Sequence, residues 1–400
     1  MAIQDMAPES GVRGPVRNSL LYDPKVRGVV VQVLLAVGLV VFFWWVIDNA
    51  RENLERANIA SGFDFLWSRA GFAISQSLIS YTSDDSYARA FVVGLLNTLL
   101  VGLLGVVLAT ILGVLAGVAR LSRNWLIAGI AAVYVETFRN VPVLLQLLFW
   151  YKAVLAVLPG PRQAIALPVG SNLSNRGLLL PWPIAEPGFS DTLMALLVAI
   201  VLAVGVGIWA RRRQLATGRP FPAFWTGLGL IILLPIVVFL VTGAPLTLSY
   251  PELKGFNFVG GLHIQPEFVA LLLGLSIYTA TFIAEIVRAG ILAVARGQSE
   301  AAHALGLRSG PTLRLVIIPQ AMRVIIPPLT NQYLNLIKNS SLAVAVGYPD
   351  LVSVFAGTVL NQTGQAVEAI LLTMLVYLTI SIATSLFMNW FNNRVALVER

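Results

Sequence analysis

The sequence lacks cysteine, contains only two histidines and carries few charged side chains. Without cysteine, the chain can form no disulfide, no thiolate nucleophile and no cysteine-bound iron–sulfur cluster. The two histidines, His263 and His303, lie too far apart along the chain to suggest a local metal site. These absences exclude thiol chemistry and leave no Cys/His cluster that would hold a metal.

The low charge content predicts a membrane protein. Charged residues make up 12% of the chain, whereas soluble domains carry about 25%. Hydrophobic residues reach 57%, and the mean hydropathy is +0.81. Several runs are free of charge and long enough to cross a bilayer; they are 28–47, 91–119, 192–210, 221–250 and 369–391. We therefore expect an all-α integral membrane protein.

The apolar runs predict about eight transmembrane helices. Glu136, Arg139 and Lys338 interrupt the third and the seventh span. Boundaries read from a sequence are accurate to a few residues. The expected spans are 28–47, 91–119, 130–157, 192–210, 222–243, 267–290, 324–346 and 368–391.

The distribution of basic residues predicts orientation. A formal charge of +8 would suit a nucleic-acid partner, but the basic residues lie in short loops beside the spans. With the N-terminus inside, 17 of the 27 lysines and arginines fall on the cytoplasmic side. Because basic residues accumulate on that side, both termini are expected to be cytoplasmic, and no nucleic-acid partner is expected. The longest loop on the same side is 288–323.

That loop carries signals for two short helices. Ser299 is expected to cap the first helix, with Glu300 in its first turn. Gly306 suits a left-handed position at the end of this helix. Pro311 stands at the start of a second helix, and Pro319 is expected to end or kink it before the next span. The result is a helix–turn–helix whose small residues suit a groove on another protein; an ordinary solvated loop is the alternative.

The same loop carries a recognisable pattern. It reads Glu300-Ala301-Ala302, three residues, Gly306, nine residues, then Val316-Ile317-Ile318-Pro319. This pattern resembles the EAA loop of bacterial ABC-importer permeases. The family usually has Ile and Leu where this chain has Val316 and Ile318, and both departures are conservative.

Further motifs resemble one branch of that family, the polar amino acid permeases of the histidine/glutamine type. Ser340 departs from the branch, which more often has Thr there, and the resemblance covers 90–157 and 267–391. The motifs are Asn97-Thr98-Leu99, Glu136-Thr137-Phe138-Arg139-Asn140-Val141-Pro142 followed by Gln146, Gly297-Gln298-Ser299, Pro319-Gln320-Ala321 and Lys338-Asn339-Ser340-Ser341-Leu342.

The extra length resembles a permease subunit of the proteobacterial general L-amino acid importers. Comparison with a minimal permease of this branch divides the chain into six segments. We expect a cytoplasmic tail at 1–27, an extra span and periplasmic segment at 28–89, the first part of the permease core at 90–157, an insertion with about two extra spans at 158–266, the second part of the core at 267–391, and a cytoplasmic tail at 392–400.

The resemblance implies a permease subunit that moves L-amino acids across the bacterial inner membrane. It also implies three kinds of protein partner in addition to membrane lipid: a second permease, a pair of ATPase subunits and a periplasmic amino-acid-binding protein. The residues it implies for ATPase docking and coupling are Gly297, Ser299, Glu300, Ala301, Ala302, Leu305, Gly306 and Pro319.

ATP hydrolysis is expected on a partner chain. A phosphate-binding loop of the Walker type needs a lysine directly after a glycine. None of the four lysines, Lys25, Lys152, Lys254 and Lys338, follows a glycine. The chain is therefore expected to bind no cofactor itself, with ATP and Mg used by the partner ATPase, and to be a transport subunit and not an enzyme.

Polar residues inside spans are costly and usually face a cavity or a partner. They give a candidate substrate pathway, although a Glu136–Arg139 pair and hydrogen bonds around Gln332 and Asn335 are structural alternatives. Gly113 and Gly117 form a G-x-x-x-G pair typical of helix packing. The pathway candidates are Asn97, Thr98, Glu136, Arg139, Gln146, Lys338, Asn339 and Ser340.

Two other classes of protein compete with an importer subunit. A transporter driven by an ion gradient usually shows internal repeats and buried coupling acids, and this chain shows no convincing repeat. An integral-membrane enzyme would need a nucleophile and base or a metal cluster, and no such set stands out. We retain the gradient-driven amino acid transporter as the alternative.

Overall fold

The computed structural model describes residues 24–56 and 61–395. Within these ranges, seven helices are long and apolar enough to cross a membrane, or eight if one bent pair counts as a single span. The multi-spanning architecture predicted from the sequence is therefore confirmed. The long helices are α1 (Pro24–Arg56), α2 (Tyr87–Ala119), α5 (Phe189–Thr217), α6 (Ala223–Val241), α7 (Pro266–Leu292), α10 (Ile318–Asn339) and α12 (Ala366–Val395).

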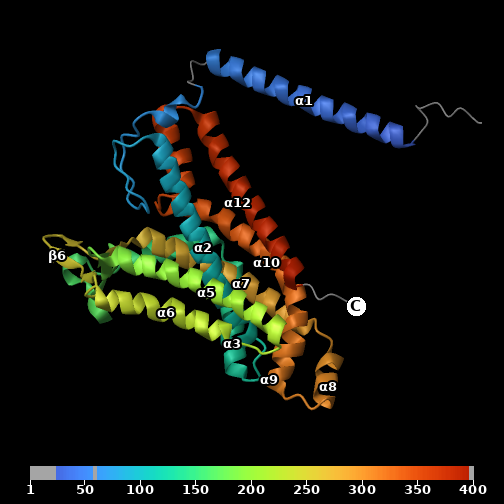
Figure 1. Ribbon diagram of the computed structural model, residues 1–400. Coiled ribbons are helices and arrows are strands. Elements are labelled where there is room, and N and C mark those ends of the chain that lie inside the picture. Colours follow the sequence, from blue (N-terminus) through green and yellow to red (C-terminus); the bar gives the residue numbers. More distant parts are fainter. Residues whose placement is uncertain (1–23, 57–60, 396–400) are drawn as a thin grey trace, which may run out of the picture.

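The main core lies between α2, α7 and α10, with α12 closing one side (Figure 1). Glycines on α2 allow α7 to approach closely. A Cβ at Gly113 would lie 2.6 Å from Cβ of Ile283, and one at Gly117 would lie 2.6 Å from the carbonyl oxygen of Ala284. Since no side chain fits at either position, the G-x-x-x-G pair packs α2 against α7, as the sequence indicated.

The third predicted span is bent sharply, which the sequence did not indicate. Helix α3 (Trp125–Asn140) and the pair α4 (Val143–Leu148) and η3 (Phe149–Leu155, a π-helix) meet at an angle of 106°. The break falls at Val141 and Pro142. Proline disfavours helical geometry in the residue before it, and Val141 is extended, with φ −96° and ψ 128°.

The seventh span is longer than predicted and passes through Pro319. Helix α9 (Ser309–Thr312), the π-helical turn η6 (Leu313–Ile317), α10 and the 3-10 turn η7 (Ser340–Ala345) form one candidate span, Ser309–Ala345. Pro319 was expected to end or kink the helix; it does not end it, and a π-helical turn lies next to it. The wider π turn comes directly before Pro319, where the missing N–H would leave a gap in ordinary α-helical bonding.

A short helix that the sequence did not suggest lies between the last two spans. The π-helical η8 (Val352–Val359) continues into α11 (Leu360–Thr363), and Gly364 turns the chain into α12 with φ +70°. The 3-10 turn η2 (Asp64–Trp67) packs nearby, where the Phe65 ring lies 5.9 Å from that of Tyr87 and 6.3 Å from that of Phe355. These contacts form a second, smaller core at one end of α2.

The insertion contains β-strands, which an all-α prediction did not include. The strands flank a hairpin of α5 and α6, which run side by side in Figure 1. An antiparallel sheet has the order β1-β2-β3-β8, and β4 pairs with β5 and β6 with β7. The strands are β1 (Ile165–Leu167), β2 (Ser171–Ser174), β3 (Gly177–Leu180), β4 (Trp182–Ala185), β5 (Leu246–Ser249), β6 (Glu252–Lys254), β7 (Asn257–Val259) and β8 (Leu262–Ile264).

Pairing between strands before and after the hairpin closes the insertion on itself. Leu179 of β3 pairs with His263 of β8, and Trp182 of β4 pairs with Ser249 of β5. The chain therefore leaves and re-enters the main body at neighbouring points. The first helix, α1, is different: every side chain of α1 that the structure describes is exposed (Figure 1).

Candidate functional site

The predicted helical loop is present as α8 (Arg296–Ala304), which projects beside α9 at one end of the molecule (Figure 1). The helix begins earlier than expected. Ala295 is its N-cap residue, with an extended ψ of 135°, so Ser299 and Glu300 lie inside the helix. The prediction that Ser299 caps α8 and that Glu300 lies in its first turn was wrong, because the helix starts without a side-chain cap.

The end of α8 is sharply defined. The N–H of Leu307 donates to the carbonyl of Ala302 (3.1 Å), and the N–H of Gly306 donates to that of His303 (2.9 Å). This is the Schellman pattern of a capped helix end. Gly306 has φ +79°, as the sequence predicted. The Nδ1 of His303 also donates to the carbonyl of Leu307 (2.9 Å), which fixes the turn further.

One side of α8 rests on the neighbouring helices and the other is open. Ala302 is buried, and the Nε2 of Gln320 donates to Oε1 of Gln298 (3.1 Å), which ties α8 to α10. Leu305 is 82% exposed, and Glu300 is also exposed. The loop is therefore an ordered helix–turn–helix with an unpacked small-residue face, and not a solvated coil.

An ionic cluster joins the ends of α2, α3 and α7 close to this loop. The Arg120 guanidinium contacts the Glu285 carboxylate (2.5 Å) and Glu136 (3.6 Å), and Arg288 also pairs with Glu285 (2.5 Å). The expected Glu136–Arg139 pair is replaced by the Arg120 contact. The Arg139 guanidinium lies 5.6 Å from the Phe282 ring centre instead.

Asn97 and Thr98 are buried and hold two parts of the chain together. The Nδ2 of Asn97 donates to the carbonyls of Gln76 (2.8 Å) and Pro349 (2.9 Å). The N–H of Leu351 donates to Oγ1 of Thr98 (3.0 Å). Both side chains thus fix the connection after α10 against α2, which is a structural use of residues considered for the pathway.

Asp350 is a buried acid that the sequence reasoning missed. Its Oδ1 accepts from the N–H of Ser353 (2.8 Å), which satisfies a donor in the first turn of η8. Its Oδ2 accepts from the hydroxyl of Tyr377 (3.2 Å), whose oxygen lies 3.4 Å from Oγ of the buried Ser340. Burial raises the pKa of the Asp350 carboxyl to about 7, and these hydrogen bonds oppose the shift. An aspartate before an apolar run is a helix-start signal that would have revealed this contact.

The side chain of Gln146 donates hydrogen bonds to backbone carbonyls at the bend in the third span. Its Nε2 donates to the carbonyls of Phe138 (2.8 Å) and Val141 (2.9 Å), which the bend at Pro142 leaves without helical partners. A buried carbonyl without a partner is costly. Gln146 therefore belongs to the bend itself.

Helix α10 carries an exposed polar stripe. Asn331, Asn335 and Lys338 are exposed and lie at i, i+4 and i+7, on one face of the helix. Asn339 is half-buried beside them. Hydrocarbon is a poor neighbour for such side chains, so this face requires water or another protein chain. The eight pathway candidates thus form no single site: the buried ones bond within the chain, and the exposed ones divide between this stripe and the Arg120 cluster.

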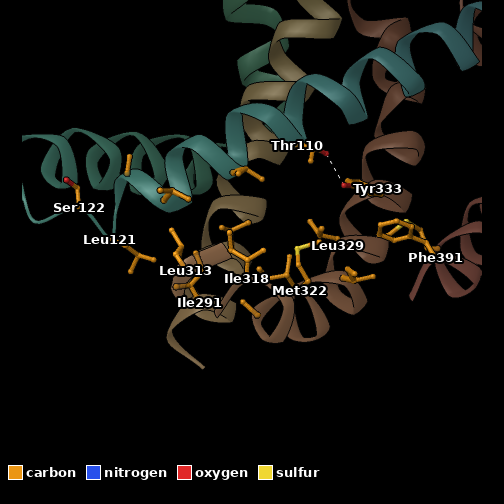
Figure 2. Close-up of a pocket in the computed structure, with 18 of the residues that line it drawn as sticks. Thr110, Leu121, Ser122, Ile291, Leu313, Ile318, Met322, Leu329, Tyr333 and Phe391 are labelled. Carbon is orange, nitrogen blue, oxygen red and sulfur yellow. Dashed lines mark hydrogen bonds between the residues drawn. The ribbon is translucent and has the colours of Figure 1, made fainter. Parts of the chain in front are cut away.

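One large cavity has the wrong chemistry for a zwitterion. It measures about 870 Å³ and lies between α2, α3, α7, α10 and α12 (Figure 2). Figure 2 shows mostly aliphatic and aromatic side chains around it, with the hydroxyls of Thr110 and Tyr333 2.9 Å from each other. Charged groups are strongly disfavoured among apolar side chains. In the described residues, no group of three or more His, Cys, Asp or Glu side chains is placed to bind a metal.

The described residues thus combine several membrane-spanning helices with an ordered helix, α8, outside them. Over residues 105–397, the chain matches the family model of the binding-protein-dependent transport system inner membrane component. The chain therefore belongs to this family of ABC-importer permeases. It is a transport subunit and not an enzyme.

Two relatives in sequence support the same assignment along the full length. The chain is 56% identical over 396 residues to the general L-amino acid transport system permease protein AapQ of Rhizobium johnstonii, covering 99% of this chain and 98% of that protein. It is 44% identical to the glutamate/glutamine/aspartate/asparagine transport system permease protein BztB of Rhodobacter capsulatus, covering 100% of both. The solved structure of an amino acid ABC transporter with histidines is 21% identical, with a TM-score of 0.46 over 77% of this chain and 95% of that chain.

Proposed function

We propose that this chain is a permease subunit of an ABC importer that moves L-amino acids across the bacterial inner membrane. Family membership and the full-length similarity to AapQ support the substrate class. The bias of basic residues supports cytoplasmic positions for both termini and for α8. An ion-gradient transporter is not favoured, because it would leave the EAA-like loop without a function.

The observation that carries this proposal is the continuity between α8 and the polar stripe. Helix α8 is tied to α10 through Gln298 and Gln320, and α10 continues through an internal proline pair to Asn331, Asn335 and Lys338. A push on α8 therefore acts on the same helix that carries the polar face. This geometry suits a subunit that receives force at one end and changes access to a pathway further along.

The partner that delivers this force is an ATPase pair, which uses the ATP and Mg. The exposed face of α8 offers small residues and the apolar side chain of Leu305, which suit insertion into a groove. We propose that docking and coupling involve Gly297, Ser299, Glu300, Ala301, Ala302, Leu305, Gly306 and Pro319.

A second permease completes the pathway. The polar stripe needs a polar or aqueous neighbour, which a facing permease would provide. Lys338 and Asn339 are the strongest remaining pathway candidates, since Asn97, Thr98, Gln146 and Ser340 already bond within the chain. Glu136 and Arg139 lie near the inner ends of the spans, where they suit gating better than substrate binding.

The proposed segment boundaries agree with the contacts within the chain. The strands on both sides of α5 and α6 pair with each other, which supports 158–266 as one inserted unit between core segments 90–157 and 267–391. The preceding segment, 28–89, adds the unpacked helix α1. We propose that the periplasmic binding protein docks on the side of the inserted strands.

Purification and transport test the proposal together. The tagged chain, extracted in mild detergent, is expected to retain a second permease and an ATPase, and to lose the ATPase when 300–306 is deleted. In proteoliposomes with the binding protein, uptake of labelled L-amino acids is expected to need ATP and to stop with vanadate. Uptake that is insensitive to vanadate but is abolished by an ionophore would instead identify a gradient-driven transporter.

A further inference from the structure

A polar cavity of about 290 Å³ opens where the inserted unit meets the start of α7. The permease core contributes Tyr151 and Lys152 from η3 and Glu267 from the first turn of α7. The inserted unit contributes Arg176, in the β2–β3 turn, and His263 of β8. Unlike the apolar cavity of Figure 2, this cavity is lined by charged side chains of both signs.

Specific contacts hold part of this lining, in which Lys152 and Arg176 are exposed. The Tyr151 hydroxyl donates to Oε1 of Glu267 (2.9 Å), and Nζ of Lys152 lies 5.0 Å from the centre of the Tyr151 ring. One tyrosine thus holds an acid at its hydroxyl and an ammonium at its ring. In the inserted unit, Nε2 of His263 donates to the backbone carbonyl of Arg176 (2.6 Å), which fixes the turn that carries Arg176.

The position of the cavity relates it to the transport pathway. Gly347 lines it and follows closely on η7, the extension of α10. The cavity therefore lies at the opposite end of the span Ser309–Ala345 from α8. If α8 faces the cytoplasm, the cavity opens on the periplasmic side, where substrate arrives.

We propose that this cavity is an outer binding site for the zwitterionic head group of an α-amino acid. Glu267 takes the α-ammonium group, and Lys152 and Arg176 take the α-carboxylate. The proposal rests on the importer function above and extends it to a site that the inserted unit helps to build. At about 290 Å³ the cavity lies just below the range of about 300–1,000 Å³ for drug-sized ligands, so it suits one small molecule.

The balance of charges also predicts selectivity. Two cations and one carboxylate leave a surplus of positive charge around the ligand. Amino acids with acidic or amide side chains are therefore expected to bind better than those with cationic side chains, because a third cation would be repelled.

The lack of cysteine in the chain provides a direct test. Ala156→Cys introduces a single thiol at the cavity, and Lys254→Cys introduces one on β6, outside its lining. The assembled importer, in nanodiscs without the binding protein, is treated with a small thiol reagent, and the modification rate of this chain is measured. The probes are L-glutamate, L-glutamine, L-lysine and N-acetyl-L-glutamate at millimolar concentration.

We expect L-glutamate and L-glutamine to slow modification at 156 by about threefold or more. L-Lysine and N-acetyl-L-glutamate are expected to have little effect, since the first adds a cation and the second lacks the ammonium group. Glu267→Gln is expected to raise the protecting concentration by about tenfold or more, the scale of a lost charged hydrogen bond. The matched change Glu252→Gln, on exposed β6, is expected to leave protection unchanged.

The outcomes separate this site from the importer function. Equal protection by glutamate and its N-acetyl derivative, or unchanged protection in Glu267→Gln, would overturn the site. Normal ATP-driven uptake together with no protection would overturn the site and leave the importer intact. Protection without any ATP-driven uptake would retain the binding site and refute the importer.

Discussion

Replacing Gly306 with alanine tests how the end of α8 contributes to coupling. Gly306 has φ +79°, and a Cβ at this position would meet no atom within 4 Å. The cost of the substitution is therefore conformational, about 1–2 kcal/mol for a side chain in the left-handed region. Such a cost lowers the population of the capped helix end about 5–30-fold.

The matching assay is the number of amino acids imported per ATP hydrolysed, measured in proteoliposomes that contain the complete importer. We expect this ratio to fall in Gly306→Ala while ATP hydrolysis continues, because a frayed α8 transmits less displacement. Gly306→Pro is expected to fall further, since proline fixes φ near −65° and removes the N–H that donates to His303.

Two controls separate conformation from simple bulk. Gly310→Ala adds the same methyl group in open space, where φ is not positive, so coupling is expected to stay near the wild-type value. Gly306→Asn is expected to recover much of the loss, because asparagine tolerates the left-handed region better than alanine. A wild-type ratio in Gly306→Ala, at normal membrane abundance, would show that a rigid helix end is not needed for coupling.

Three other changes test the contacts around the pathway. Arg120→Met should reduce the free energy of unfolding in detergent by about 1–3 kcal/mol, seen as a lower thermal midpoint, since its partner Glu285 is partly buried. Glu136→Gln should change the midpoint little because that carboxylate is 59% exposed. Equal effects of the two changes would contradict this ranking. Gln146→Leu should destabilise the chain by about 1–3 kcal/mol in the same assay because two carbonyls at the bend lose their donor, and a neutral result would mean that water replaces the amide. Lys338→Leu should keep normal abundance and slow uptake about tenfold, a barrier increase of about 1.4 kcal/mol, and unchanged uptake would remove it from the pathway.

The number of spans and their approximate positions could be predicted because charge-free runs report directly on the bilayer. Gly306 was also predictable, since one residue type dominates left-handed helix ends. The bend at Pro142 was not predicted because the apolar composition continues across it, and composition does not report direction. The proline itself was the available signal, through its effect on Val141.

The strands of the insertion escaped prediction for a different reason. Each has only three or four residues, and their partners lie on the far side of the α5–α6 hairpin. Leu179 and His263 pair across more than 80 positions of sequence, which no local pattern can express. Short strands whose partners are this remote become visible only when the chain is folded.

The pathway candidates could be predicted only in part from the sequence, because a polar residue inside a membrane can either bond to the backbone or line a pathway. Asn97 and Gln146 stood out as polar residues in apolar spans, yet both bond to backbone carbonyls that the fold leaves open. Lys338 stood out for the same reason and lies on an exposed face. Whether such a residue bonds to the backbone or faces a pathway depends on the backbone around it. That backbone is set by bends and connections that the sequence did not show.

The arrangement of α8, α10 and the polar cavity argues for coupling along one continuous element. The span Ser309–Ala345 carries the docking helix at one end, the polar stripe of Asn335 and Lys338 in its second half, and the cavity near Gly347 at its far end. A displacement of α8 therefore has one helical span along which to reach both the stripe and the cavity. The π turn at Leu313–Ile317 and the Pro327-Pro328 pair inside α10 both lie between the docking helix and the stripe, and they mark the positions where bending would concentrate. If coupling runs along this helix, stiffening that turn should alter the coupling ratio and leave amino acid protection of the cavity unchanged.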